Sequence, residues 1–497
     1  MTAPDEAAIH IHVLPKPCGK ASVCVSSTRT NGIARMLASP EHRANARRLI
    51  TLLYGLCPIA HLTAFDSALL AARGRPSEKR GSAFARLPET AVTAEAIVEN
   101  LRVLVCESEK LEARTALLGG FAAPQEGRPP LPLPLTPILG KEEHRQIGAL
   151  RARLALIAQL LVRLDPHSEE GPDPALFQRL LDALSALLAE ARTAASRLLF
   201  GMEPEEFLKN LHDRRFDLRG WAESHAGTIP AAHLLLSLLA EPRPPEADVQ
   251  FLPERSEIMT PDFAEEIAYR LLNDSGFDMA PFWQGAPRLT GALSRMRNNP
   301  AVRDLLISEG ISPAALTGAR IVETACLFAR AKALLDLSAG LIDRAMPKEG
   351  ESAPLSTSEE DGRNVLWTYG PEAGIGISFV ETARGLLMHA VKLIPSGELQ
   401  TLRITSPTEW QFSPNGAGQR MASLAAKAFL YPKDDMDDRA KLENAVERAL
   451  FGLDACVPTV FAWNGARRSK SESKPCMNSP SPKEFSKSSN APRAQTM

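Results

Sequence analysis

The segment Leu52-Leu53-Tyr54-Gly55-Leu56-Cys57-Pro58-Ile59-Ala60-His61 places a cysteine between a glycine break and a proline. Pro58 suits the first turn of a helix, so we expect Cys57 at or beside the N-cap of a helix that begins there. A thiol in that position meets unpaired N–H groups and the positive end of the helix dipole. Both effects lower the pKa of a cysteine and favour the thiolate that binds metals. The sequence therefore makes Cys57 the first candidate ligand.

A second cysteine with a nearby proline lies close to the other end of the chain, in Asp454-Ala455-Cys456-Val457-Pro458-Thr459. The other cysteines are scattered and form no CxxC pair: Cys18, Cys24, Cys106, Cys326 and Cys476. A total of seven without paired spacing argues against a disulfide framework and favours a reducing cytosol. We therefore expect a cytoplasmic protein.

Composition excludes some classes of function. The chain has 497 residues, 23% of them charged, and a formal charge of −2. This near-neutral balance gives no electrostatic footprint for nucleic acid. Leucine and alanine dominate, which favours a mostly helical fold. No basic region precedes a long apolar run, so we expect neither a signal peptide nor a membrane-spanning segment.

Local patterns predict strands near both chain ends and helices between them. Residues 8–26 alternate apolar and polar around a proline-containing turn, which predicts a β-hairpin. Residues 40–73 read as helices interrupted at Gly55. Amphipathic spacing predicts helices at 141–164, 174–199, 204–214, 231–240, 263–275, 288–306 and 311–345. Strand patterns return at 376–381, 386–393 and 399–404.

We expect one domain over residues 1–463, with loops near 124–138, 241–262 and 347–363. Residues 464–497 are rich in Ser, Lys and Pro and are expected to be disordered, because such a tail buries too little apolar surface. One stripe at helical spacing predicts core packing and no cofactor site: Leu150, Leu154, Ile157, Leu161 and Leu164.

The two cysteine segments resemble the boxes that hold nickel and iron in the large subunit of [NiFe]-hydrogenases. In that family the consensus sequences of the two boxes are Arg-x-Cys-Gly-x-Cys and Asp-Pro-Cys-x-x-Cys. Here Tyr54 and Thr459 stand in two of the cysteine places, and Cys57 and Cys456 remain. Soft thiolates suit nickel and low-spin iron, and neither tyrosine nor threonine replaces them for nickel. The resemblance therefore implies no complete nickel–iron centre, but two thiolates for a single iron unit.

The resemblance continues in order along the chain, over residues 26–33, 119–124, 383–389 and 407–411. The degenerate boxes resemble the HupK-type hydrogenase maturation proteins, relatives of the large subunit associated with assembly of the iron-containing part of the cofactor. The resemblance implies an α+β, mostly helical, large-subunit-like fold, with a helical bundle core and small β-sheets from the N- and C-terminal segments. The chain ends must meet, because the two boxes form one site.

The resemblance gives Cys57 the place of a thiolate that bridges two metals, and Cys456 that of a terminal nickel ligand. A buried structural cysteine is the alternative for each. His61 follows Cys57 by one helical turn and resembles a family histidine that donates a hydrogen bond to sulfur. A satisfied core histidine is the alternative for His61.

Arg384 matches a family arginine that faces the iron's cyanide ligands, and Thr408 matches a hydroxyl that donates to the other cyanide. A guanidinium suits this role because its donors are fixed and its charge is permanent. The alternatives are a surface salt bridge beside Glu381 for Arg384 and an ordinary strand threonine for Thr408. Removal of Arg384 is expected to weaken retention of the iron unit and to leave the fold largely intact.

Three other residues have simpler interpretations. Tyr54 is expected to fill the nickel space as a hydrophobic plug. His10 and His12 have a strand spacing that suits a metal, but without a third ligand we expect them to be solvated.

The function expected from these residues is a non-catalytic scaffold that holds an Fe(CN)2(CO) unit transiently and passes it on. The expected partners are HypC-like small chaperones and the immature hydrogenase large subunit, with neither nucleic acid nor membrane. Two other functions stay open: an active metalloenzyme with an altered site, and an iron-free structural chaperone. Metal content distinguishes the three.

Overall fold

The computed structural model describes residues 7–74, 83–118, 140–164, 173–213, 216–241, 249–343, 366–432 and 435–463. The α-helices are α1 (Gly32–Leu37), α2 (Ala46–Leu53), α3 (Pro58–Ala72), α4 (Ala83–Leu101), α5 (Ser108–Leu117), α6 (Lys141–Arg163), α7 (Pro174–Ala195), α8 (Pro204–Asn210), α9 (Leu218–His225), α10 (Pro230–Ala240), α11 (Arg255–Ile258), α12 (Pro261–Asn273), α13 (Ala292–Met296), α14 (Pro300–Glu309), α15 (Pro313–Asp343), α16 (Pro407–Gln411), α17 (Ala417–Ala426) and α18 (Met436–Leu450). Short 3₁₀ or π turns are η1 (Arg43–Asn45), η3 (Arg102–Glu107), η4 (Ser196–Phe200) and η6 (Phe451–Leu453). The strands are β1 (Ile9–Pro15), β2 (Ala21–Ser27), β3 (Gln250–Phe251), β4 (Arg288–Leu289), β5 (Leu366–Tyr369), β6 (Ile375–Thr382), β7 (Gly385–Leu393), β8 (Leu399–Thr405) and β9 (Thr459–Trp463).

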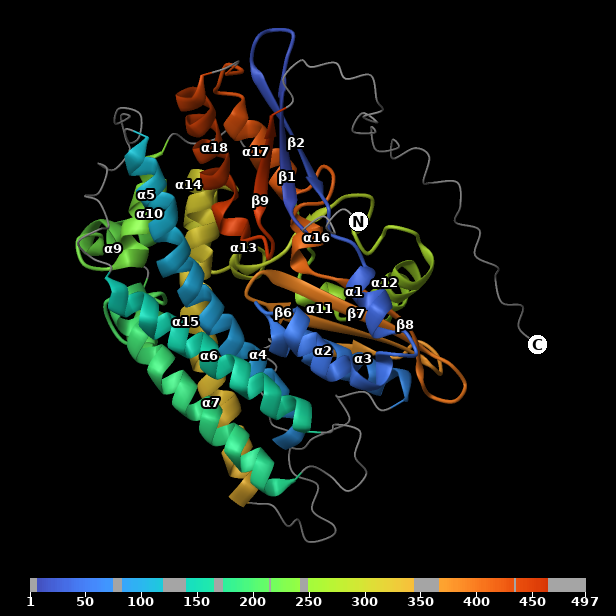
Figure 1. Ribbon diagram of the computed structural model, residues 1–497. Helices are drawn as coiled ribbons and strands as arrows, with labels where there is room; N and C mark the ends of the chain where they lie inside the picture. Colours follow the sequence, from blue (N-terminus) through green and yellow to red (C-terminus); the bar gives the residue numbers. More distant parts are fainter. Residues whose placement is uncertain are drawn as a thin grey trace.

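A helical bundle forms the larger part of the fold, with small sheets beside it (Figure 1). Helix α15 packs along α4, and α6 packs along α7. In the described residues the strands form sheets of order β2-β1-β9, β3-β4 and β5-β6-β7-β8. The α+β class predicted from the sequence, mostly helical with small sheets, is confirmed.

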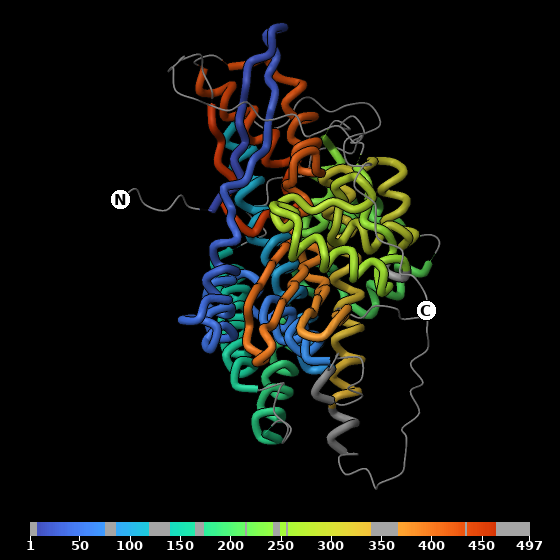
Figure 2. Tube along the Cα trace, turned by 90° about the vertical axis from the view of Figure 1, so that its right-hand side faces the viewer, coloured from blue at the N-terminus to red at the C-terminus, as the bar shows by residue number. Residues whose placement is uncertain are grey.

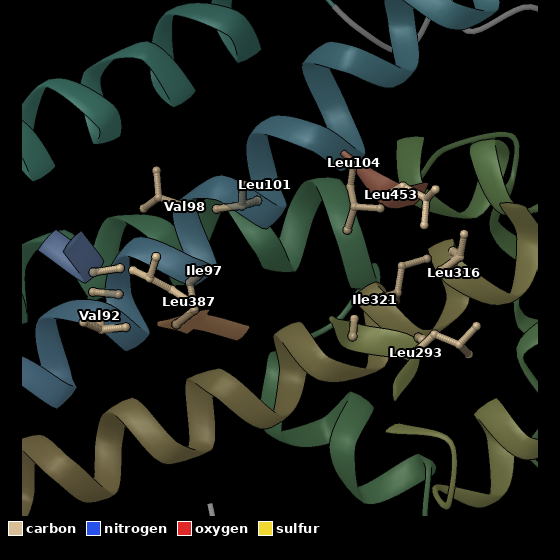
Figure 3. Close-up of a cluster of buried hydrophobic side chains, with 14 of the residues drawn as sticks. Val92, Ile97, Val98, Leu101, Leu104, Leu293, Leu316, Ile321, Leu387 and Leu453 are labelled. Atoms are coloured by element: carbon tan, nitrogen blue, oxygen red, sulfur yellow. The ribbon is translucent and has the colours of Figure 1, made fainter. Parts of the chain in front are cut away.

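The bundle core anchors the segment that leads to the second cysteine. Figure 3 shows apolar side chains from α4, α13, α15, β7 and η6 that point toward one another. Leu453 of η6 is fully buried in this cluster, directly before Asp454. Burial of one such side chain contributes roughly 1.5–3 kcal/mol. The stripe on α6 is buried as predicted: Leu150, Leu154, Ile157, Leu161 and Leu164.

The two ends of the described chain meet in one sheet. Strand β1 pairs antiparallel with β2, and on its other edge it pairs parallel with β9. Ile9, Ile11 and Val13 alternate into the core, which fixes the register because a slip of one residue would expose all three. Figure 2 shows the blue hairpin beside the red C-terminal segment. This pairing places Cys456, just before β9, next to the N-terminal hairpin, so the predicted meeting of the chain ends is confirmed.

The antiparallel sheet β5-β6-β7-β8 has α3 on one face and α12 on the other. Helix α3 approaches so closely that a Cβ at Gly376 would lie 2.1 Å from the carbonyl oxygen of Ala68. Only glycine permits this approach. The sheet therefore fixes the position of α3, which begins at the first cysteine, relative to the turn that carries Arg384 between β6 and β7.

Most of the predicted elements are confirmed, including the hairpin, the helices on both sides of Gly55 and the three strands after residue 375. The single helix predicted over 288–306 is wrong, because β4, α13 and α14 occupy this stretch. Pro300 starts α14, where its missing N–H costs nothing, and the Asn299 side chain accepts a hydrogen bond from Ala301.

Some predictions fall outside the described residues. They are the loops near 124–138 and 347–363 and the tail 464–497. The described part of the connector 241–262 contains β3 and α11. A single domain over 1–463 stays a prediction. Among the helices that the structure describes, none combines the length and the apolar character needed to cross a membrane.

Candidate metal-binding site

Cys57 is the N-cap residue of α3, as predicted, with Pro58 in the first turn. The expected low pKa is wrong: burial raises the pKa of the Cys57 thiol well above its ordinary value, and the charge of Arg384 only partly opposes this. A second reason is that the carboxyl group of Glu95 already occupies the helix terminus. Ile59 and Ala60 donate their backbone N–H groups to Glu95 at 2.8 and 2.9 Å.

Glu95 therefore takes the positive end of α3 that the sequence had suggested for the thiol. Burial raises the pKa of Glu95 to about 8, although the two backbone donors work in the opposite direction. The helix terminus consequently lends little stabilisation to a thiolate at Cys57, and a bound metal would have to supply it.

Cys456 lies in the loop between η6 and β9 and receives two side-chain donors. The guanidinium of Arg29 donates to its sulfur, and the Thr408 hydroxyl donates to the same sulfur at 3.1 Å. Arg29 is held in place by Glu409 at 2.8 Å. The backbone N–H of Cys456 also donates to the Thr408 oxygen at 3.3 Å. Thr408 lies in α16, so the strand alternative is wrong, and its hydroxyl faces the sulfur.

Arg384 is buried between two carboxylates. Its Nη2 donates to Glu99 at 2.9 Å, and its Nε lies 3.1 Å from a carboxylate oxygen of Asp454 without hydrogen-bond geometry. Its side chain is only 3% exposed. The alternative interpretation of Arg384, a surface salt bridge beside Glu381, is therefore wrong. Glu381 pairs with Arg295 instead.

Asp454 joins three arginines from different parts of the chain. Arg102 from η3 and Arg320 from α15 reach its carboxylate at 3.2 and 3.4 Å, opposite Arg384. Burial alone would raise the pKa of Asp454, but the three guanidinium groups outweigh it and hold that pKa below its ordinary value. The backbone of Asp454 has φ of 50°, a left-handed conformation that is unusual for a residue with a side chain. The ion pairs thus fix a strained loop two residues before Cys456.

A glycine between two strands sets the position of Arg384. Gly385 has φ of 134°, and a Cβ there would lie 2.1 Å from Thr290 Oγ1. We expect Gly385→Ala to destabilise the protein more than Gly397→Ala, measured by chemical denaturation. Gly397 also has positive φ, but its Cβ would meet open space, so this control has only the backbone cost of about 1–3 kcal/mol. Equal losses in the two variants would contradict the proposed steric constraint.

His61 pairs with a second buried histidine. Its Nδ1 lies 3.0 Å from Nε2 of His389 on β7. The Tyr54 ring stacks on the His61 ring, with centroids 3.7 Å apart. No hydrogen bond from His61 to a cysteine sulfur is formed between the described residues, so a donor role toward sulfur stays a prediction.

The structure brings Cys57, Cys456 and Arg384 into one site. The Arg384 guanidinium and Cys456 both lie close enough to the Cys57 thiol to influence its pKa. Within the described residues no group of three or more His, Cys, Asp or Glu side chains is arranged to hold a metal ion. This statement covers His10 and His12, whose rings hydrogen-bond Thr28 and Ser26. The protein thus supplies a pair of thiols and surrounding charges, and metal binding by Cys57 and Cys456 stays a prediction.

Sequence reasoning missed four of the residues that shape this site. Arg29 and His389 lie within segments that resemble the hydrogenase family. Their position in those segments could have indicated that they belong to the site. Glu95 and Glu99 lie one turn apart on α4, in a segment without a motif. A pair of carboxylates inside an otherwise apolar helix was the available signal, because such groups are rarely buried without partners.

No protein-family model matches the chain. The hydrogenase expression/formation protein HoxV of Cupriavidus necator is 28% identical over 309 residues, which cover 59% of this chain and 70% of that protein. The HupK protein of Bradyrhizobium diazoefficiens is 27% identical over 450 residues, 88% of this chain and 91% of that protein. The chain is similar to these hydrogenase expression/formation proteins. The chain is also similar to HupK of Rhizobium leguminosarum bv. viciae, with 26% identity over 398 residues. The resemblance predicted from the two cysteine segments is confirmed.

The chain is also similar to solved structures of nickel-dependent hydrogenases. A reduced, active Ni-Fe-Se hydrogenase from Desulfomicrobium baculatum gives a TM-score of 0.47 at 15% identity, over 89% of this chain and 96% of that one. An NAD+-reducing [NiFe]-hydrogenase in the H2-reduced state gives 0.44 at 13% identity, over 89% and 94%. At these identities the likeness concerns the fold alone.

Proposed function

We propose that this chain is a non-catalytic accessory protein of [NiFe]-hydrogenase maturation. Its curated relatives are named for hydrogenase expression or formation, which supports this role. The finer part of the proposal is that the chain holds an Fe(CN)2(CO) unit at Cys57 and Cys456 and passes it to the immature large subunit. The iron unit is then cargo and not a resident cofactor.

The observation that carries the proposal is the proximity of these two half-buried cysteines to each other and to a cluster of arginines. Four arginines lie near the pair, Arg29, Arg102, Arg320 and Arg384, and they pair with the carboxyl groups of Glu99, Glu107, Asp454 and Glu409. The guanidinium of Arg384 opposes the rise in the pKa of the Cys57 thiol, and in this way it favours the thiolate that an iron unit requires.

Two thiolates are enough for such a unit, because its remaining iron ligands travel with it. Soft sulfur suits low-spin iron, and the missing thiolates at Tyr54 and Thr459 disfavour nickel. The contacts of Arg384 use Nε and Nη2, so its Nη1 group is left to donate to a cyanide. Thr408 would stabilise the Cys456 thiolate, since its hydroxyl already faces that sulfur.

The test is metal analysis with infrared spectroscopy on protein purified anaerobically from cells that assemble hydrogenase. We expect iron without nickel, infrared bands of metal-bound CO and cyanide, and no hydrogen uptake. Iron together with nickel and hydrogen uptake would mean an active enzyme with an altered site. Absence of both metals would mean an iron-free chaperone.

The partners in this proposal are the immature large subunit and a HypC-like small chaperone. One partner receives the iron unit and the other delivers it. A cytoplasmic location belongs to the same proposal, because the cysteines must stay reduced to bind iron.

A further inference from the structure

Two imidazoles form a buried pair between α3 and β7. His61 Nδ1 and His389 Nε2 are 3.0 Å apart, and both side chains are almost completely buried. Burial lowers the pKa of His389 to about 3, and it holds the pKa of His61 well below its ordinary value. Each ring is therefore neutral and has one proton, on one of its two nitrogens. At this distance one ring must donate and the other must accept.

The outer nitrogens of the two rings have different surroundings. His389 Nδ1 is sealed from solvent and has no hydrogen-bond partner. His61 Nε2 is not among the sealed polar atoms of the described residues that lack a partner. A proton on the outer nitrogen of His389 would thus be sealed without a partner, whereas the outer nitrogen of His61 is not sealed in this way.

This difference between the outer nitrogens decides which of the two rings donates the hydrogen bond and which accepts it. If His61 donated, the proton of His389 would sit on Nδ1 as a sealed, unsatisfied N–H group. If His389 donates from Nε2, the sealed atom is only an acceptor, and the proton of His61 sits on Nε2. Sealed N–H donors without partners are the rarer defect in folded proteins. The second arrangement is therefore favoured.

We infer that His389 is a positioning residue that fixes the tautomer of His61, so that His61 presents an N–H group at Nε2 on the site side of the pair. The stacked Tyr54 ring holds the His61 ring in its plane. His61 lies one turn after Cys57 on the same side of α3. Arg29, which faces the same region, is committed to Cys456 and Glu409.

An N–H at Nε2 would suit an anionic group beside Cys57, either a thiolate or a metal-bound cyanide. This choice of ligand rests on the proposed function. The tautomer itself does not, because it follows from the hydrogen bonds of the metal-free protein. An experiment can therefore contradict the proposed ligand without contradicting the tautomer of His61, and the reverse.

The experiment is nitrogen-15 NMR of the metal-free protein with labelled histidine, which reports the protonation of each ring nitrogen. A His61→Asn variant assigns the signals of His61 among the ten histidines of the chain. We expect an unprotonated Nδ1 and a protonated Nε2 for His61. His389→Gln should keep this pattern, because the carboxamide N–H can replace the donor at Nε2. In His389→Leu the shift difference between the two His61 nitrogens should shrink, as both tautomers become populated.

Two results would overturn the inference. One is a protonated Nδ1 on His61 in the wild-type protein. The other is an unchanged shift difference in His389→Leu, which would show that His389 does not control the tautomer. Should His389→Leu fail to fold, the wild-type and His389→Gln spectra still decide the matter. Loss of the pattern in a folded His389→Gln would count against the donor role.

Discussion

Arg384→Leu is expected to lower the free energy of unfolding by about 3–5 kcal/mol, because it removes one of the two buried cations that Glu99 and Asp454 share, the other being Arg102. The sequence alone suggested a largely intact fold for this variant. The burial of Arg384 adds a loss of stability to that expectation, since a leucine cannot compensate either carboxyl group. Arg102 and Arg320 still face Asp454, which places the loss within that range and keeps it from abolishing the fold.

Denaturant unfolding followed by circular dichroism measures this loss. Arg403→Leu is the matched control, because Arg403 lies on β8 of the same sheet, is 31% exposed and reaches Asp278 only at 4.0 Å. We expect the control to lose less than about 1 kcal/mol. Similar stability of the two variants would mean that the buried ion pairs contribute little.

The effect of Arg384→Leu should depend on pH. In the wild type the arginines hold the pKa of Asp454 below its ordinary value, so its stabilising contribution is present above the ordinary pKa and is lost as pH falls through the lowered one. Without Arg384, fewer positive charges oppose the effect of burial on Asp454, so the pKa of Asp454 rises. The difference in stability between wild type and variant should therefore shrink on acidification, because a protonated carboxyl group needs no cation.

Cys57→Ser is expected to abolish the infrared bands of metal-bound CO and cyanide in anaerobically purified protein. A serine hydroxyl has nearly the shape of a thiol but is not a soft ligand for low-spin iron. Cys456→Ser should have the same effect, since both sulfurs are needed to hold one iron. The fold should persist in both variants, so circular dichroism should match the wild type.

Cys18→Ser is the control, because Cys18 is an exposed free cysteine in the turn of the N-terminal hairpin. Its bands should equal those of the wild type. Bands that persist in Cys57→Ser would place the iron unit elsewhere. Bands lost in Cys57→Ser but retained in Cys456→Ser would assign Cys456 to its structural alternative.

Much of the local structure was readable from the sequence, because its causes act over a few residues. Pro58 at a helix start, the alternation of Ile9, Ile11 and Val13, and the leucine stripe of α6 all predicted what the structure has. The resemblance in the two cysteine segments also required the chain ends to meet, and β9 beside β1 confirms it. Here the order of motifs along the chain supplied information that periodicity does not.

The chemistry of the site was decided by tertiary structure. The pKa of Cys57 was predicted with the wrong sign, because burial raises it and because Glu95 from another helix occupies the helix terminus that would have lowered it. The burial of Arg384 and its pairing with Glu99 have the same origin. Local pattern sets which residues form a helix or a strand, but protonation and ion pairing depend on solvent exclusion and on partners distant in sequence. Only the folded chain brings those partners within hydrogen-bond distance.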